Sequence, residues 1–299
     1  MRRAMKKIVR IILIFGVTHL IFNHCQKQDD ASVLQKPYLA QNPPGRIPEV
    51  FAPGKVSTEK YSETGCTFTR DGKEFYFTRT KGGLAEPTIF VSRFENSGWT
   101  DPEQVMFKGY GPHISPNGKR MLVTKRRQIN DRERTLDIWI LQRTDEAWNE
   151  SQNLGPGARA SMSRNGTLYF IDRSSEADRG VIAMREFVDG SYRESKIVGG
   201  GVNSPFYDAH PCIAADESYI IFDSDRPGGQ GWGDLYICFR DENGVWGEAI
   251  NLGDKINTSG GNICASLSPD GKYVFYLANR DIYWVDAKII EELNPDFIK

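Results

Sequence analysis

The sequence has no apolar run long enough to cross a membrane and almost no helical periodicity. Its longest apolar run, Ile11 to Phe22, holds about a dozen residues, whereas a transmembrane helix needs ~20. Mean hydropathy over the 299 residues is −0.48, which argues against a protein with several membrane spans. Helical spacing appears only near the C-terminus. We therefore expect an all-β chain with a short helical tail at 288–299.

The sequence also lacks the motifs of several enzyme classes. It contains no G-x-S-x-G nucleophile elbow, no glycine-rich nucleotide-binding motif and no paired CxxC. The S-x-D-x-G-x-x-W repeat of bacterial sialidases is absent as well. These absences predict that the chain is not an enzyme and that it uses no cofactor and no metal.

No excess of positive charge remains on the main part of the chain. The chain has 38 basic and 39 acidic residues, and five of the basic ones lie in the first 25 residues. The remainder therefore carries 33 basic and 39 acidic residues. The basic cluster at 125–134 is interrupted by Asp131 and Glu133, as in a solvated hairpin loop. We expect no nucleic-acid partner.

What the sequence does contain is a repeated pattern. At 266–287 the letters SLSPDGKYVFYLANRDIYWVDA combine an Asp-Gly turn with runs of aromatic and β-branched residues, typical of three short antiparallel strands. We expect Asp270-Gly271 to form a two-residue hairpin loop. Earlier copies are centred, with spacings of 46, 48, 51 and 54 residues, on Asp71, Asn117, Asn165 and Asp216. This period, with about four strands per unit, predicts a β-propeller.

The fifth unit stops after three strands, and an N-terminal segment is expected to complete it. Residues 48–65 resemble 248–265, the segment that precedes the fifth unit. The piece around 48–52 can therefore pair with the last blade and close the ring, which removes two open sheet edges. We predict a single propeller of five blades over 46–287. The alternative is six blades, with a degenerate blade in the linker at 187–210.

Two further residue types recur at defined places in the units. The first four units each continue with a bulky aromatic, at Trp99, Trp148, Tyr192 and Trp246. We interpret these aromatics as wedges between blades rather than as sugar-stacking platforms. The cysteines Cys66, Cys212, Cys238 and Cys264 fall inside strands, where a thiol packs as a small apolar group. Cys66 and Cys264 begin neighbouring inner strands, so they are the one pair considered for a disulfide.

The units resemble the WD40-like propeller repeat of the TolB type. The core of that repeat reads roughly S-P-D-G-K, a hydrophobic strand, a polar-Arg turn and D-I-Y. SPDGKYVFYLANRDIY at 268–283 matches it closely, and HISPNGKRMLVTKR at 113–126 matches well. The resemblance implies the fold over about 80% of the chain. Propellers of this type serve as periplasmic interaction scaffolds, substrate-gating domains and ligand binders, so it does not specify a function.

The first 25 residues resemble a bacterial lipoprotein signal. Five basic residues precede the apolar run, and Cys25 follows it. Asn23 and His24 depart from the small residues usual before such a cysteine, which leaves ordinary secretion or an uncleaved anchor as alternatives. We expect lipidation at Cys25, a flexible tether at 26–45 and a location in the cell envelope, periplasmic or on the outer membrane.

The mouth of the central channel is the predicted binding site, because loops from all blades converge there. Counting six residues back from each turn gives Gly65, Gly111, Arg159, His210 and Cys264, and counting eight back gives Glu63, Gly109, Gly157, Asp208 and Asn262. From these segments we select six ligand-binding candidates: Glu63, His113, Arg159, Asp208, His210 and Asn262. The alternative is that these polar groups cap strands or bind channel water.

The sequence-based hypothesis is an exported, lipid-anchored propeller that acts as a binding or protein-interaction scaffold in the cell envelope. Its partner is expected to be a protein or a small polar ligand at the channel mouth, and the chain is expected to be a monomer. The alternative function is a carbohydrate-active hydrolase, in which Glu63 and Asp208 face each other across the mouth.

Overall fold

A computed structural model describes residues 38–81, 86–131, 133–145, 147–173 and 180–294. The chain divides into two compact units, Met1–Ser32 and Val33–Lys299, and all described residues belong to the second. Cys25 and most of the predicted tether lie outside the described residues. Within the described part, no helix is both long enough and apolar enough to span a membrane.

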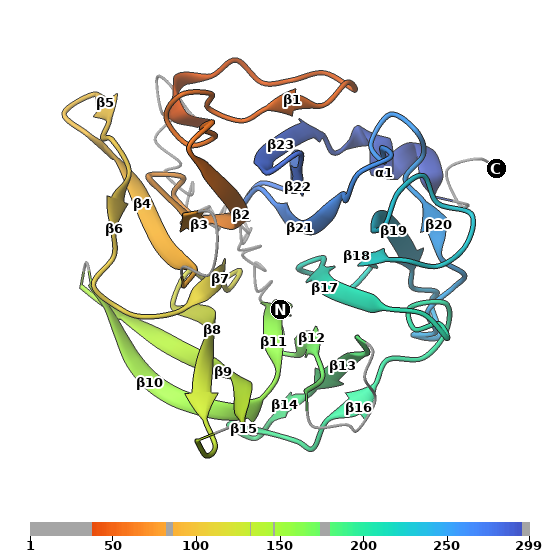
Figure 1. The fold of residues 1–299 in the computed structure, drawn as a ribbon. Coiled ribbons are helices and arrows are strands. Elements are labelled where there is room, and N and C mark those ends of the chain that lie inside the picture. Colours follow the sequence, from red (N-terminus) through yellow and green to blue (C-terminus); the bar gives the residue numbers. More distant parts are fainter. Residues whose placement is uncertain (1–37, 82–85, 132, 146, 174–179, 295–299) are drawn as a thin grey trace, which may run out of the picture. The chain divides into compact units, whose positions relative to one another are not determined.

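Five antiparallel sheets follow one another around a ring (Figure 1). Blade 1 contains β2 (Tyr61–Phe68), β3 (Glu74–Lys81), β4 (Thr88–Glu95), β5 (Gly98–Trp99) and β6 (Glu103–Gln104). Blade 2 contains β7 (Tyr110–Ile114), β8 (Arg120–Gln128), β9 (Arg134–Thr144) and β10 (Ala147–Pro156). Blade 3 contains β11 (Ala158–Met162), β12 (Leu168–Ile171), β13 (Ile182–Arg185) and β16 (Lys196–Ile197), with the hairpin of β14 (Phe187–Val188) and β15 (Ser191–Tyr192).

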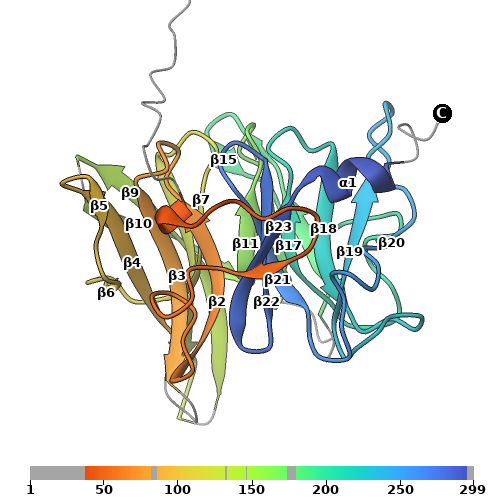
Figure 2. The same ribbon diagram turned by 90° about the horizontal axis from the view of Figure 1, so that it is seen from above.

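The remaining two blades complete the ring. Blade 4 contains β17 (Asp208–Ile213), β18 (Tyr219–Ser224), β19 (Asp234–Phe239) and β20 (Ile250–Asn251). Blade 5 contains β21 (Ile263–Leu267), β22 (Tyr273–Ala278), β23 (Asp281–Asp286) and β1 (Glu49–Val50). The first strand of each blade contacts the first strand of the next, so that β2, β7, β11, β17 and β21 surround the centre. In Figure 2 these strands run along the axis of the ring.

Local hydrogen bonds stabilise the repeated turn. In blade 5 the backbone N–H of Ser268 donates to the carbonyl of Tyr273 at 2.9 Å, which closes the loop. Asp270 Oδ1 accepts a hydrogen bond from Ser268 Oγ at 2.7 Å, and Gly271 has a φ of 71° that suits glycine. The loop therefore holds four residues, 269–272, and the sequence-based expectation of a two-residue loop was wrong.

The N-terminal segment closes the ring as predicted. β1 pairs with β23, Glu49 lying opposite Trp284, and the N–H of Phe51 donates to the carbonyl of Ile282 at 2.8 Å. Phe51 is fully buried and packs in one cluster with Phe68, from blade 1, and with Trp284. The segment therefore supplies the fourth strand of blade 5 and also packs against blade 1.

The strands of the linker at 187–210 up to Ile197 belong to blade 3, residues 208–210 begin β17 of blade 4, and the described linker holds no sixth blade. Its β14 and β15 form a hairpin, and β16 pairs with β13. The five-bladed prediction is confirmed.

The four recurring aromatics pack between blades, as predicted. Trp148 Nε1 donates to the hydroxyl of Tyr76 in blade 1 at 3.0 Å. Trp246 meets Tyr169 of blade 3 edge-on, with 6.2 Å between ring centroids. Trp99 lies against Phe68, in the cluster that joins blades 1 and 5, and Tyr192 packs against the cluster between blades 2 and 3.

Both ends of the described chain pack on the ring. The short 3-10 helix η1 (Tyr38–Ala40) buries Leu39, and the Tyr38 ring lies 5.0 Å from that of Tyr273. The propeller was predicted to begin at residue 46, after a tether at 26–45. The described residues pack on the ring from Tyr38 onward, so the last part of the predicted tether belongs to the packed structure. Near the C-terminus, α1 (Lys288–Leu293) buries Ile290 in the cluster between blades 4 and 5.

Candidate functional site

Every innermost strand carries a β-bulge at the same place. The pairing of each inner strand with its neighbour shifts register there, between Thr64 and Cys66 in blade 1 and between Ile263 and Ser266 in blade 5. The equivalent residue in each bulge is left-handed, with φ values of 52°, 61°, 51°, 48° and 58° at Gly65, Gly111, Arg159, His210 and Cys264. These are the positions six residues before each turn. A bulge re-aims a side chain, and here the bulges line the channel.

Three of the five bulge positions carry a side chain at an energetic cost. A left-handed backbone costs about 1–3 kcal/mol for a residue other than glycine, yet Arg159, His210 and Cys264 adopt it. Glycine occupies the other two positions because Arg159 fills the space beside them. A Cβ on Gly65 would lie 2.6 Å from Arg159 Nη1, and one on Gly111 would lie 2.7 Å from Arg159 Cδ. Retained strain of this kind is typical of functional sites.

Side chains from the second strand of the preceding blade hold these bulges in place. The N–H of Gly111 donates to Thr78 Oγ1 at 2.8 Å, and the N–H of Arg159 donates to Thr124 Oγ1, also at 2.8 Å. In blade 4 the same position is occupied by Asp223, whose Oδ1 accepts from the N–H of Cys264 at 3.0 Å. A carboxylate has acceptor capacity beyond this bond, and Asp223 uses it on His210.

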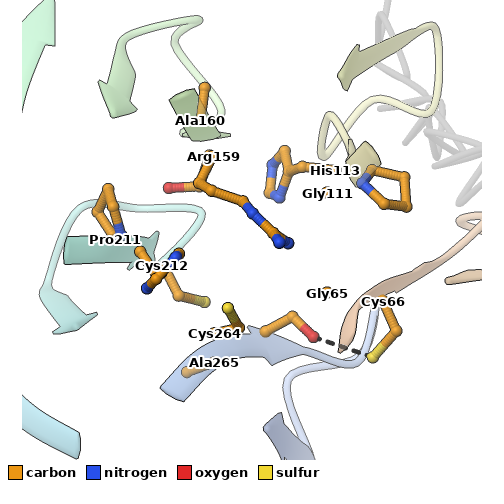
Figure 3. Close-up of a pocket in the computed structure, with 14 residues that line it drawn as sticks. Gly65, Cys66, Gly111, His113, Arg159, Ala160, Pro211, Cys212, Cys264 and Ala265 are labelled. Atoms are coloured by element: carbon orange, nitrogen blue, oxygen red, sulfur yellow. Dashed lines mark hydrogen bonds between the residues drawn. The ribbon is translucent and has the colours of Figure 1, made fainter. Parts of the chain in front are cut away.

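The bulge residues surround a small cavity at the centre of the ring (Figure 3). The cavity has a volume of about 40 Å³, which suffices for one or a few water molecules. In Figure 3 the side chain of Arg159 extends into the middle of the cavity, and the thiol of Cys264 points into the same space. The described lining residues are Gly65, Cys66, Gly111, Pro112, His113, Arg159, Ala160, Ser161, His210, Pro211, Cys212, Cys264, Ala265 and Ser266. None of these is acidic.

The side chain of Arg159 places a guanidinium group in this cavity, and one nitrogen of that group lacks a hydrogen-bond partner among the described residues. Its guanidinium lies over the ring of Tyr110, 4.9 Å from the centroid. Its Nη1 atom is buried, and no hydrogen-bond partner for it exists among the residues that the structure describes. A buried donor without a partner is costly, so this nitrogen is available to an acceptor that enters the channel.

His210, Asp223 and Cys264 form a connected group beside Arg159. His210 Nδ1 lies 2.9 Å from Asp223 Oδ1 and 3.0 Å from Oδ2. Burial acts to lower the pKa of His210, but Asp223 and Cys264 outweigh it and raise this pKa to about 10. Burial acts to raise the pKa of Cys264, but the charges of His210 and Arg159 outweigh it and lower this pKa. These effects favour a protonated His210 next to a Cys264 thiol that ionises more readily than an ordinary cysteine.

His113 is the neutral histidine of the cavity. Burial lowers its pKa to about 4, and its Nε2 accepts a hydrogen bond from the backbone N–H of Met162 at 3.0 Å. This bond joins blade 2 to blade 3. Nε2 of His113, one of the six ligand-binding candidates, is therefore already occupied as an acceptor.

The structure brings His113, Arg159 and His210 together at the cavity, and it places the other three candidates elsewhere. Glu63, Asp208 and Asn262 are fully buried and do not line the cavity. Each accepts from a hydroxyl four or five residues earlier: Thr58 to Glu63 at 3.1 Å, Ser204 to Asp208 at 2.8 Å and Thr258 to Asn262 at 3.0 Å.

Arginines complete the bonding of the two carboxylates outside the cavity. Arg79 binds Glu63 at 2.9 Å, and Arg226 binds Asp208 at 2.6 Å. The arginines also donate to backbone carbonyls of the segment that enters the blade, at Val56 and Val202. These groups tie entering loops to inner strands. The hydrolase alternative therefore has no pair of carboxylates facing this cavity.

Sequence reasoning missed two residues of the site, Asp223 and Cys264. Asp223 stands where Thr78 and Thr124 stand in earlier blades, so an alignment of second strands contains the signal. Cys264 was placed at a bulge position but was interpreted only as a packed thiol. Across the described part of the chain, no group of three or more His, Cys, Asp or Glu side chains is arranged to hold a metal ion.

No family model matches the chain, and no curated protein matches it. Solved structures do. A TolB protein from Acinetobacter baumannii has 18% identity and a TM-score of 0.46, covering 75% of this chain and 54% of that one. A mannose phosphorylase from Leishmania mexicana, solved with a phosphate ion, has 13% identity and a TM-score of 0.50, covering 80% and 87%. A xylan β-1,4-xylosidase from Bacillus halodurans has 13% identity and a TM-score of 0.48, covering 77% and 53%.

These similarities show the propeller fold and correct one prediction. The chain spans about half the length of the A. baumannii TolB protein and of the xylosidase. The mannose phosphorylase is an enzyme by name, so the fold that this chain shares with it includes enzymes. The prediction that the chain is not an enzyme, drawn from missing motifs, was therefore wrong. At these identities the similarities carry the fold and no activity.

Proposed function

We propose that the chain is an exported propeller that binds a small polar ligand in its central channel, with Arg159 as the principal contact. The buried Nη1 atom of Arg159 carries this proposal, because it has no partner among the described residues and lies on the cavity, where Gly65 and Gly111 leave room for the arginine side chain. Rigid loops around a propeller channel are a common place for such sites.

The charges around the cavity favour a ligand that presents acceptor oxygens. Arg159 is a permanent cation, and the raised pKa of His210 keeps its ring protonated, Asp223 and Cys264 outweighing the effect of burial. No described lining residue is acidic. The cavity of about 40 Å³ admits only a terminal group such as a carboxylate or a carbonyl. The rest of the ligand, whether a small molecule or the end of a protein chain, would remain in the channel mouth.

Replacing Arg159 by Gln should weaken binding of small carboxylates without unfolding the ring. A hydrogen bond to a charged group is worth ~1.5–3 kcal/mol, so affinity should fall by about tenfold or more. Titration of acetate and succinate, followed by calorimetry or by NMR shifts, measures this effect. Arg193→Gln is the matched control, because Arg193 lies outside the cavity and its side chain is 52% exposed. Equal affinities for the Arg159→Gln and wild-type proteins would contradict the proposal.

We also propose that the chain is held in the cell envelope through a lipid on Cys25. The order of basic residues, apolar run, Cys25 and polar segment supports this proposal. Cys25→Ser should move the protein from the membrane fraction to the soluble fraction, because acyl chains contribute ~0.8 kcal/mol per buried CH₂. Fractionation and mass spectrometry of the N-terminal peptide measure this. An unmodified Cys25 in the mature protein would rule out lipidation.

A further inference from the structure

We infer that Cys264 is a nucleophile activated by His210 and Asp223, and that the electrophile it meets in the cavity is a hydroperoxide. The inference goes beyond the proposed binding function, since it stands even if no carboxylate binds. It rests on the placement of three side chains from two blades around one small cavity, and on the space that this cavity offers.

Asp223 fixes the relative position of the other two residues. Its Oδ1 atom lies 2.9 Å from His210 Nδ1 and 3.0 Å from the backbone nitrogen of Cys264. One carboxylate oxygen therefore holds the imidazole ring and the chain at Cys264. With Nδ1 bound to Asp223, Nε2 is the ring nitrogen that remains for the thiol. This is the order of orienting acid, base and nucleophile used in covalent catalysis.

Cys264 differs electrostatically from the other described cysteines. Burial raises the pKa of Cys66, Cys212 and Cys238 to about 12. For Cys264 the same effect of burial is outweighed by His210 on β17 and Arg159 on β11, which lower its pKa although Asp223 on β18 opposes them. The thiolate is the reactive form of cysteine. Among the described cysteines, Cys264 is therefore the one best equipped to react as a thiolate.

The backbone supports the same conclusion independently. Gly65 and Gly111 show that this ring position accepts glycine, which adopts a left-handed φ without strain. Cys264 and His210 occupy it at φ values of 58° and 48°. A side chain that only filled space could be replaced by glycine at a gain in backbone energy. The strain is retained at the residues that make up the reactive pair.

The size of the cavity limits the electrophile. About 40 Å³ holds one or a few molecules of the size of water, and hydrogen peroxide is only slightly larger than water. An ester or peptide carbonyl with its two substituents would need Arg159 to leave the cavity. Arg159 and His210 offer N–H groups to the two oxygens of a peroxide. Hydrogen bonds from these groups stabilise the oxygen that leaves when the O–O bond breaks.

The reaction balances with the groups present. The sulfur of Cys264 attacks one peroxide oxygen, so that an S–O bond forms and the O–O bond breaks. The sulfur is oxidised by two electrons to a sulfenic acid, and the peroxide is reduced to water. The leaving oxygen takes the proton from His210, which ends as a neutral imidazole bound to Asp223. The electron pair of the O–O bond goes to the departing oxygen.

Oxidation of the full-length, reduced protein by hydrogen peroxide tests this inference. Sulfenic acid is trapped with dimedone, and each cysteine is quantified by peptide mass spectrometry. At pH 7 we expect Cys264 to react at least about tenfold faster than Cys238, which is buried outside the cavity. The rate at Cys264 should fall as His210 loses its proton near its pKa of about 10, to which Asp223 and Cys264 raise it against the effect of burial.

Two variants separate activation from folding. Asp223→Asn keeps an acceptor for the Cys264 N–H but removes the charge, so the fall in rate should move to lower pH. Arg159→Gln should lower the rate at pH 7 by about tenfold, and Cys264→Ser should abolish the dimedone adduct at this position. An equal rate at Cys264 and Cys238 would overturn the inference. Reaction of Cys264 with iodoacetamide but not with peroxide would overturn the assigned electrophile.

Discussion

Deleting residues 26–53 should make the protein aggregate. The deletion removes β1, which pairs with β23, and it removes Phe51 from the cluster between blades 5 and 1. Blade 5 would then expose an unpaired strand edge and the apolar surface around Trp284. Size-exclusion chromatography and thermal melting measure the outcome. A deletion protein that stays monomeric with an unchanged melting temperature would show that the ring does not depend on this closure.

Two less drastic changes separate the strand from the segment before it. Deleting only 26–37 leaves η1 and β1 intact and should change neither the melting temperature nor the elution volume. Phe51→Ala keeps the backbone pairing but empties a fully buried site, and such a change costs ~3–5 kcal/mol. The loss should appear as a lower denaturant midpoint at an unchanged slope.

Most of the fold can be predicted from the sequence because each blade repeats a similar local sequence pattern. An Asp-Gly or Asn-Gly turn recurs in four of the blades and Asp216-Glu217 stands in the remaining one, at similar spacing, and each turn is followed by a β-branched and aromatic strand. The missing fourth strand of the last unit could be sought at the other end of the chain. The loop around Asp270 was mispredicted because a side-chain bond from Ser268 favours a four-residue loop over the two-residue alternative.

The candidate site was only partly predictable, and the bulges are the physical reason. In a regular strand, residues six and eight positions before the turn point to the same face. The extra residue in each bulge reverses this relation, so Arg159 and His210 reach the cavity whereas Glu63 and Asp208 point toward the entering loops. The partnership of Asp223 with Cys264 joins two blades, and no local pattern in the sequence reports such a contact.

The His210–Cys264 pair should make no net contribution to the pH dependence of stability below about pH 9, over the range in which the pH exceeds both 6.5 and the lowered pKa of Cys264. The folded pair holds one proton, on His210. In the unfolded chain the reference pKa values are 6.5 for His210 and 9.0 for Cys264, so between them the pair also holds one proton, on sulfur. Equal numbers of bound protons give zero slope.

Outside this window the signs differ on the two sides. Below 6.5 the unfolded chain binds a second proton, so stability falls with falling pH wherever folded Cys264 is still ionised, its pKa being lowered because His210 and Arg159 outweigh the effect of burial. Above 9.0 the unfolded chain loses its last proton, while folded His210 keeps its proton until about 10, so stability falls as the pH rises through this interval. Within the window, His210 alone or Cys264 alone would make folding stability depend on pH. The two dependences have opposite signs and cancel.

Cys264→Ser should remove that cancellation. Asp223 still favours the charged ring, so the unfolded histidine loses its proton above 6.5 while the folded one keeps it. Stability should then fall by up to ~1.4 kcal/mol per pH unit. Urea unfolding of the wild-type and Cys264→Ser proteins at three pH values between 6.5 and 8.5 measures this difference. Cys238→Ser is the control, because burial raises the pKa of Cys238 to about 12 and its thiol stays protonated in both states. That control should lower stability equally at all three values, and wild-type and Cys264→Ser curves that run parallel would show that no imidazolium–thiolate pair exists.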